Sequence, residues 1–124
     1  MLITNSKAEE MYENLKSVLN RADIIGYAAA LNSKRLENIV DPYFITRNAL
    51  ISQYGEPELD ENGKKTGRSL VRFDNPNFDQ FKMELERISS IEHEVDIFKI
   101  NSEDVINKLT GNEILNIIWM FEDL

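Results

Sequence analysis

The chain has 124 residues, of which 42% are hydrophobic and 29% charged, a composition typical of one globular domain, residues 1–124. The absence of cysteine excludes disulfides, thiolate metal sites and cysteine nucleophiles, and the formal charge of −8 disfavours direct binding to nucleic acid. No apolar run approaches the roughly 20 residues needed to cross a bilayer, and no secretory signal opens the chain, so we expect a cytoplasmic protein without a membrane span.

The first half of the chain carries signals for helices. Ser6-Lys7-Ala8-Glu9 has the form of a capping box, and apolar residues then recur at helical spacing, which predicts a helix near 6–20. Asp23 is the predicted cap of a second helical region that continues to Gly55. Because proline in a helix interior removes a hydrogen bond, Asp41-Pro42 predicts a kinked or broken pair of helices.

The middle of the chain combines a turn, a helix and two short strands. The Asn62-Gly63 pair within the polar stretch 55–67 predicts a loop or hairpin tip. Asn75-Pro76 opens a predicted helix that ends near residue 91. The β-branched content of 68–73 and 94–100 predicts two strands, which we expect to pair with each other.

The carboxyl-terminal segment is the most apolar part of the chain. Asn101 or Ser102 is the predicted cap of a short helix that Gly111 ends, and Asn112 is the predicted cap of a last helix over 113–122. That last helix has almost no polar face, so we expect it to be either the central core helix of a monomer or part of an interface. The candidate protein-binding residues are Ile114, Ile117, Ile118, Trp119 and Phe121.

Together these elements predict an α+β fold that is predominantly α. We expect a helical bundle or hairpin, with helices near 6–20, 23–55 and 76–91, that carries a small two-stranded β element.

Motifs for catalysis and metal binding are weak in this sequence. His93 lies between Glu92 and Glu94, but consecutive side chains point in different directions, so a structural or surface role is favoured over a proton shuttle or metal ligand. Residues 58–63 resemble the first half of a calcium loop, yet the twelfth position is Ser69 and not the required glutamate. We therefore predict no catalytic residue, no metal site and no cofactor.

The densest basic cluster consists of Lys64, Lys65, Arg68 and Arg72. If 68–73 is a strand, Arg68 and Arg72 share one face of it. Four acidic residues precede the cluster, so charge compensation within the loop is favoured over contact with an anion or an acidic partner.

Three stretches of the sequence carry a resemblance to a known group of proteins: Tyr27 to Leu36, Arg47 to Gly55, and Asp60-Glu61-Asn62-Gly63-Lys64. Over residues 24–100 the chain resembles short, uncharacterised tailed-bacteriophage proteins. In these a long helix with an Arg-x-x-Leu-Ile-x-x-Tyr-Gly ending leads into an Asp-Glu-Asn-Gly-Lys turn, a second helix and a short strand. The resemblance implies a viral origin and carries over no active-site residues.

The functional expectation is a non-catalytic protein-interaction module, encoded by a phage, that contributes to virion structure or assembly. The alternative is an acidic inhibitor of a host defence protein, similar to an anti-CRISPR protein, that occupies a basic nucleic-acid channel. Either function implies a protein partner or a homo-oligomer, without direct binding to nucleic acid or membrane. The expected location is the cytoplasm, which is the host cytoplasm for a viral protein, or the virion.

Overall fold

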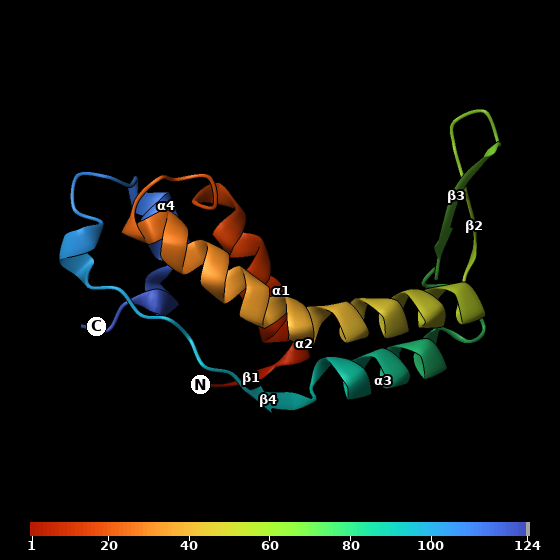
Figure 1. The fold of residues 1–124 in the computed structure, drawn as a ribbon. Coiled ribbons are helices and arrows are strands. Elements are labelled where there is room, and N and C mark those ends of the chain that lie inside the picture. The colour runs from red at the N-terminus through yellow and green to blue at the C-terminus, as the bar shows by residue number, and fades with distance from the viewer. Residues whose placement is uncertain (124) are drawn as a thin grey trace. The chain divides into compact units, whose positions relative to one another are not determined.

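The computed structural model describes residues 1–123, and its element order confirms the predicted class, α+β and predominantly α (Figure 1). The elements are β1 (Leu2–Thr4), α1 (Asn5–Asn14), η1 (Leu15–Ser17), α2 (Ile24–Tyr54), β2 (Glu56–Leu59), β3 (Lys65–Leu70), α3 (Phe78–Ser89), β4 (Glu92–Glu94), η2 (Ser102–Asp104), α4 (Gly111–Asn116) and η3 (Ile118–Met120). None of the helices in residues 1–123 combines the length and hydropathy that crossing a membrane requires.

The chain divides into two compact units. Unit 1 comprises Met1–Val40 and Glu92–Leu124, and unit 2 comprises Asp41–Ile91. The single domain of the sequence analysis stays a prediction, since helix α2 runs through both units.

Unit 1 contains an antiparallel sheet formed by β1 and β4, in which Ile3 lies opposite His93. The Met1 amide carbonyl also accepts a hydrogen bond from the Val95 N–H at 2.8 Å. The predicted pairing of 68–73 with 94–100 is therefore wrong. Residues 95–99 are not assigned to a strand, and the partner of β4 is a three-residue segment that is too short to give a sequence signal.

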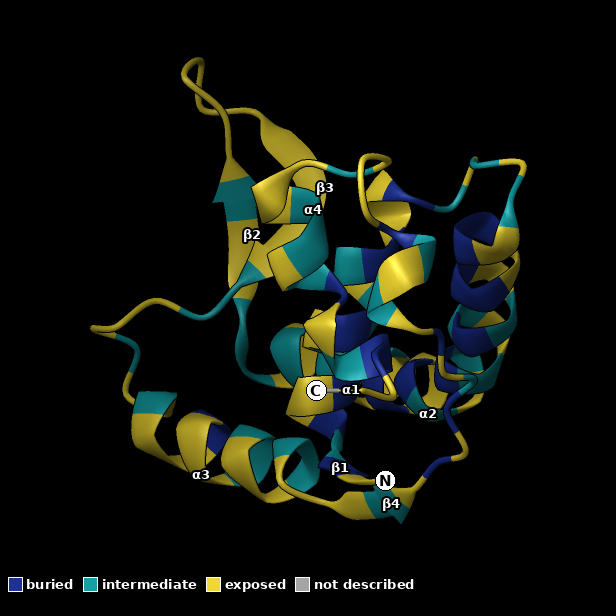
Figure 2. Ribbon diagram, turned by 90° about the vertical axis from the view of Figure 1, so that its left-hand side faces the viewer, coloured by how far each residue is buried: buried dark blue, intermediate teal, exposed yellow. Residues whose placement is uncertain are grey.

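The core of unit 1 is built from helix stripes and from the extended segment that follows β4. Its fully buried side chains include Met11, Leu15, Ile25 and Leu36 from the first half of the chain, and Ile117 and Met120 from the end. In Figure 2 the ribbon of these helices alternates between the colours of buried and exposed residues, as expected of helices that bury one face. The core therefore depends on segments that lie far apart in the sequence.

Asn32 is a polar side chain inside this core and is fully buried. Its amide Nδ2 donates to the Phe98 carbonyl at 3.0 Å, and its Oδ1 accepts from the Phe98 N–H at 2.8 Å. The side chain therefore pairs with a backbone residue as a neighbouring strand would, which satisfies both polar groups of Phe98. This contact ties α2 to the segment after β4.

Helix α1 begins earlier than the sequence predicts. The cap is Thr4, whose hydroxyl accepts a hydrogen bond from the Lys7 N–H at 3.0 Å, and not Ser6. The strand β1 ends at Thr4, so the residue that closes the strand also opens the helix. The helix ends at Asn14 and a single 3-10 turn, η1, follows it.

Helix α2 continues through Asp41 and Pro42 without interruption, so of the predicted kinked or broken pair of helices the broken alternative is wrong. Asp41 and Pro42 are exposed, whereas Val40 and Tyr43 on either side are buried. A proline ring removes one backbone hydrogen bond from a helix, and burial of the neighbouring apolar side chains offsets that loss.

Unit 2 consists of the second half of α2, the β2–β3 hairpin and α3. The predicted helix after Asn75-Pro76 is confirmed as α3, which lies beside α2 with the Phe81 and Tyr54 rings 6.2 Å apart (Figure 1). The predicted hairpin tip is also confirmed: Gly63 has a φ of 77°, and the Asp60 N–H donates to the Lys64 carbonyl at 2.8 Å. The strand assigned to 68–73 instead spans 65–70 and pairs with β2.

The predicted carboxyl-terminal helix over 113–122 is shorter in the structure. It comprises α4, which ends at Asn116, and the 3-10 turn η3. The cap is Thr110 and not Asn112, because a reciprocal capping box joins Thr110 and Glu113. Earlier in this region, Asn101 caps η2 in a second capping box, which agrees with one of the two predicted caps.

Candidate interaction surfaces

The five candidate residues at the carboxyl terminus lie close together in sequence but differ in burial. Ile117 is fully buried and Phe121 is nearly so, Ile114 and Trp119 are half-buried, and Ile118 is 43% exposed. Leu115, which was not among the candidates, is 66% exposed. The segment therefore contributes to the core of unit 1 through one set of side chains and leaves another set at its surface.

Backbone hydrogen bonds hold this segment against residues 99–100. The Ile100 N–H donates to the Met120 carbonyl at 2.9 Å, and the Glu122 N–H donates to the Ile100 carbonyl at 2.9 Å. Lys99 Nζ adds a hydrogen bond to the Trp119 carbonyl at 3.0 Å. The Trp119 indole N–H donates to the Asn116 carbonyl at 3.0 Å, so its polar atom is already used within the segment.

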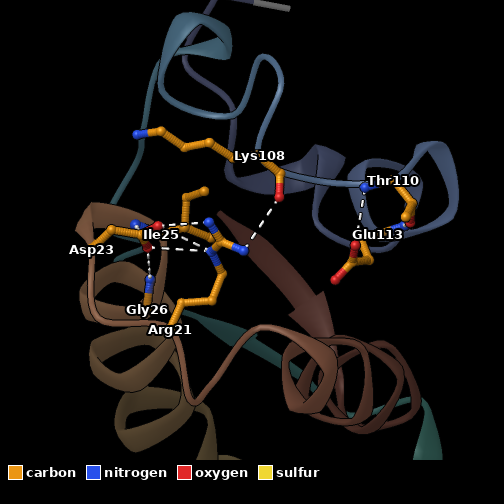
Figure 3. Close-up of polar contacts among 7 residues, drawn as sticks. All are labelled: Arg21, Asp23, Ile25, Gly26, Lys108, Thr110 and Glu113. Atoms are coloured by element: carbon orange, nitrogen blue, oxygen red, sulfur yellow. Dashed lines mark hydrogen bonds and ion pairs between the residues drawn. The ribbon is translucent and has the colours of Figure 1, made fainter.

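The start of α2 carries a network of polar contacts (Figure 3). Asp23 Oδ1 accepts hydrogen bonds from the Ile25 and Gly26 N–H groups, which confirms Asp23 as the cap of the helix. The Arg21 guanidinium binds the Asp23 carboxylate at 2.8 Å and also donates to the Lys108 carbonyl at 3.3 Å. The Arg21 hydrogen bond is the main cause that lowers the pKa of Asp23 below its usual value.

A second capped carboxylate lies at the start of α4, also drawn in Figure 3. Glu113 Oε1 accepts a hydrogen bond from the Thr110 N–H at 2.9 Å, while the Thr110 hydroxyl accepts from the Glu113 N–H at 3.2 Å. The hydrogen bond from the Thr110 backbone is the main cause that lowers the pKa of Glu113. Such reciprocal contacts explain where the helix begins, and they leave no free reactive group.

We predict that unit 1 loses stability in acid. A carboxyl group whose pKa is lowered by folding stabilises the folded state above the pKa of the unfolded chain, about 4, and that contribution disappears as the pH falls through the folded value. Denaturant titrations at pH 7, 5 and 3 should therefore show the stability falling below about pH 4. Asp23→Asn, which keeps a capping oxygen but cannot titrate, should lose less stability on acidification than the unchanged protein.

Glu61→Gln is the matched control for this titration. Glu61 lies at the exposed hairpin tip and makes no hydrogen bond or ion pair to any other residue in 1–123. Its substitution should leave the pH dependence unchanged. Equal acid sensitivity of Asp23→Asn and the unchanged protein would contradict the assignment of this contribution to Asp23.

Unit 2 has a very different surface from unit 1. Its only two buried apolar side chains are Tyr43 and Phe81, although the unit spans 51 residues, Asp41 to Ile91. Its exposed large apolar side chains are Ile45, Leu59, Phe73, Met83 and Ile91, of which Phe73 is 87% exposed. Figure 2 shows the hairpin almost entirely in the colour of exposed residues. Sequence periodicity did not indicate this surface. It shows which residues are apolar, but not which of them pack against other side chains in the fold.

An open groove of about 420 Å³ lies between α2 and β3 within unit 2. Its lining residues are Asn48, Ile51 and Ser52 from α2, and Gly67, Arg68 and Ser69 from β3. Sequence analysis placed Arg68 in a basic cluster but did not identify the other five residues as lining a groove. They come together because the chain turns at Gly55 from the end of α2 into the hairpin. A Cβ atom on residue 55 would lie 2.9 Å from the Leu70 carbonyl oxygen, so this close approach requires glycine.

The basic cluster of the hairpin forms no ion pair with the acidic residues that precede it. Among residues 1–123, the ion pairs within 4.0 Å involve none of Lys64, Lys65, Arg68 and Arg72. The favoured interpretation, charge compensation within the loop, therefore stays a prediction that no ion pair within 4.0 Å supports. Arg72 also lies beyond the end of β3, so it does not share a strand face with Arg68.

His93 and the calcium-like loop at 58–63 both make hydrogen bonds to neighbouring parts of the chain. His93 Nε2 is 2.9 Å from Asn5 Oδ1, a contact between β4 and the first residue of α1. In the calcium-like loop, Asp60 Oδ1 accepts hydrogen bonds from the Asn62 and Lys64 N–H groups. Within residues 1–123 there is no group of three or more histidine, aspartate or glutamate side chains arranged to hold a metal ion.

Comparison of the chain with protein-family models gives no match, and comparisons with curated proteins and with solved structures give none either.

Proposed function

We propose that this chain is a non-catalytic protein-interaction module, encoded by a tailed phage, that contributes to virion structure or assembly. The observation that supports the proposal is the surface of unit 2, which buries two apolar side chains and exposes five large ones. A domain of about 60 residues ordinarily buries about 60% of the surface of its unfolded chain, and exposed large apolar side chains are a feature of sites where proteins meet. A partner that covers this surface would supply the missing burial.

The proposal is tested by following the protein through particle assembly. Lysates of the producing cells are separated on a density gradient, and each fraction is assayed for the chain and for capsid and tail proteins. We expect the chain in fractions that contain particles or assembly intermediates. Recovery solely from particle-free fractions would overturn the role in the virion.

Paired variants connect this result to the surface of unit 2. Ile45→Ser with Phe73→Ser replaces two exposed side chains, so the fold should be retained while association with particles falls at least about tenfold. Ile106→Ser in unit 1 is the matched control, because Ile106 is also an exposed isoleucine. Thermal melts of all three proteins establish that the comparison is made between folded chains.

A second candidate function is supported by the charge of the carboxyl-terminal part. Residues 92–123 carry eight acidic and two basic side chains, and Glu92, Glu94 and Asp96 are all exposed. An acidic surface of this kind is suited to a basic nucleic-acid channel of a host defence protein. The chain would then be an inhibitor, similar to an anti-CRISPR protein.

Competition with nucleic acid separates this candidate from the first. An inhibitor that occupies a basic channel should bind a purified nucleic-acid-binding nuclease at low salt, release it at high salt, and compete with the nuclease's own nucleic acid. Absence of competition at low salt would contradict the inhibitory role, whatever the density gradient shows.

A further inference from the structure

The groove between α2 and β3 has the chemistry of a site for a negatively charged ligand. Its polar lining residues are Asn48, Ser52, Arg68 and Ser69, and its lining includes no aspartate or glutamate. None of these four side chains makes a hydrogen bond or ion pair to another residue in 1–123. Four residues whose side chains can donate hydrogen bonds therefore line one groove, and none of these side chains is already paired within residues 1–123.

Other charges of the hairpin reinforce this preference. Lys64, Lys65 and Arg72 flank Arg68 in the sequence and are likewise outside every ion pair of residues 1–123. A cluster of unpaired cations next to hydrogen-bond donors is a typical recognition site for carboxylate or phosphate groups. Ile51 adds an apolar contact to the groove.

The volume of the groove favours a peptide over a single small anion. Its volume of about 420 Å³ lies within the range of roughly 300–1,000 Å³ that is typical of pockets for ligands with several functional groups. The groove lining supplies one guanidinium, from Arg68, which suits a single carboxylate better than the row of phosphates that a nucleic-acid backbone presents.

The hairpin is poorly suited to receive another strand at its edges. Pro57 lies in β2 and has no N–H to donate, and Gly67, with a φ of 87°, lies where the register between the strands shifts. Proline and bulges of this kind protect edge strands from pairing with other chains. A ligand would therefore be recognised by side chains in the groove, and not by extension of the sheet.

We propose that this groove binds an acidic segment of a partner protein, with Arg68 as the residue that pairs with a carboxylate of that segment. The inference rests on the proposed function, since it names the chemistry of the partner that an interaction module would engage. Ile51 contacts an apolar side chain next to the carboxylate, and Asn48, Ser52 and Ser69 donate hydrogen bonds to the segment.

The test measures binding of the full-length protein to a short fluorescein-labelled peptide of alternating glutamate and valine, by fluorescence anisotropy. We expect saturable binding that weakens as salt is added, and no binding of the peptide in which lysine replaces glutamate. Arg68→Glu should weaken binding at least about tenfold. Arg68→Lys, which keeps the charge but loses the planar pair of donors, should weaken it less.

Lys82→Glu is the matched control, because it makes the same change of charge at an exposed position of α3 outside the groove lining. Equal losses in Arg68→Glu and Lys82→Glu would overturn the inference, since they would show a general effect of charge. Displacement of the peptide by an equal concentration of inorganic phosphate, or tighter binding of a single-stranded oligonucleotide, would overturn the assignment to a protein segment.

Sedimentation of the protein alone completes the test. A dimer that Arg68→Glu abolishes would overturn the assignment to a separate partner and identify a second copy of this chain as the occupant. Failure of peptide binding together with particle association in the density gradient would reject the groove and keep the proposed function. Peptide binding without particle association would keep the groove as a binding site and reject the proposed function.

Discussion

Replacing Asn32 by alanine is expected to lower the free energy of unfolding by about 3 kcal/mol. Asn32 is fully buried and satisfies both the N–H and the carbonyl of Phe98, at 2.8 and 3.0 Å. Alanine would leave both backbone groups without a partner in an apolar environment and would leave a cavity beside them. Each of these changes costs free energy, and they add because neither can be relieved by water without opening the core.

Equilibrium denaturation in urea measures this effect. Asn38→Ala is the matched control, since Asn38 is an exposed asparagine on the same helix and alanine favours helix formation. Its stability should equal or slightly exceed that of the unchanged protein. A loss in Asn32→Ala no greater than about 0.5 kcal/mol would contradict the pairing of Asn32 with Phe98.

Asn32→Asp distinguishes hydrogen bonding from packing, because it keeps the shape of the side chain. A carboxylate can accept from the Phe98 N–H but cannot donate to the Phe98 carbonyl, and burial raises the pKa of the new acid. Protonation restores the donor, so the deficit of this variant should shrink as the pH falls from 7 toward about 4. A deficit independent of pH would indicate that packing alone accounts for the role of Asn32.

Replacing Gly26 by alanine is expected to destabilise the protein by at least about 2 kcal/mol, although alanine is the better helix former. A Cβ atom at position 26 would lie 1.8 Å from the carbonyl oxygen of Arg21 and 2.7 Å from the carbonyl carbon of Arg21. Both contacts are with backbone atoms, and the Arg21 N–H is itself held by the Val18 carbonyl. The turn before α2 would have to move, which would disturb the cap formed by Asp23.

Gly111→Ala provides the control for helix propensity alone. Gly111 is the first residue of α4, and a Cβ atom there would meet no other atom within 4 Å. Thermal melts should therefore show a large decrease in the melting temperature for Gly26→Ala and little change for Gly111→Ala. If Gly26→Ala were the more stable protein, the close approach of the Arg21 carbonyl would be refuted.

Local signals predicted the elements whose determinants lie within a few residues. The Asp23 cap and the turn at Asn62-Gly63 both appear in the structure as expected, because a side-chain oxygen or a glycine decides such features without help from the rest of the fold. The helix predicted from Asn75-Pro76 is present as α3, but it begins at Phe78 with Asn77 as its cap, two residues later than a proline in the first helical position indicates.

Sequence reasoning failed where distant segments decide the structure. The partner of β4 is β1, and neither strand exceeds three residues, so no alternation of apolar and polar residues marks them. Residues 95–100 are rich in β-branched residues, yet at Phe98 the backbone is paired by the Asn32 side chain instead of a strand. In the carboxyl-terminal segment Ile117 is buried and Ile118 is exposed, although the two side chains are equally hydrophobic. Hydrophobicity alone therefore could not predict which of them belongs to the core.

In the sequence, unit 2 separates the two segments that form unit 1, and this order determines when each unit can fold during synthesis. The Met1 carbonyl and the Val95 N–H that bonds to it are 94 residues apart, and the core needs Ile117 and Met120. Contacts so distant in sequence close slowly, and the core can be completed only after residues 117–120 have left the ribosome. The hairpin and α3 depend on nearer neighbours, so the core of unit 1 stays incomplete longest, and the nascent chain is most prone to aggregation until Ile117 and Met120 are in place.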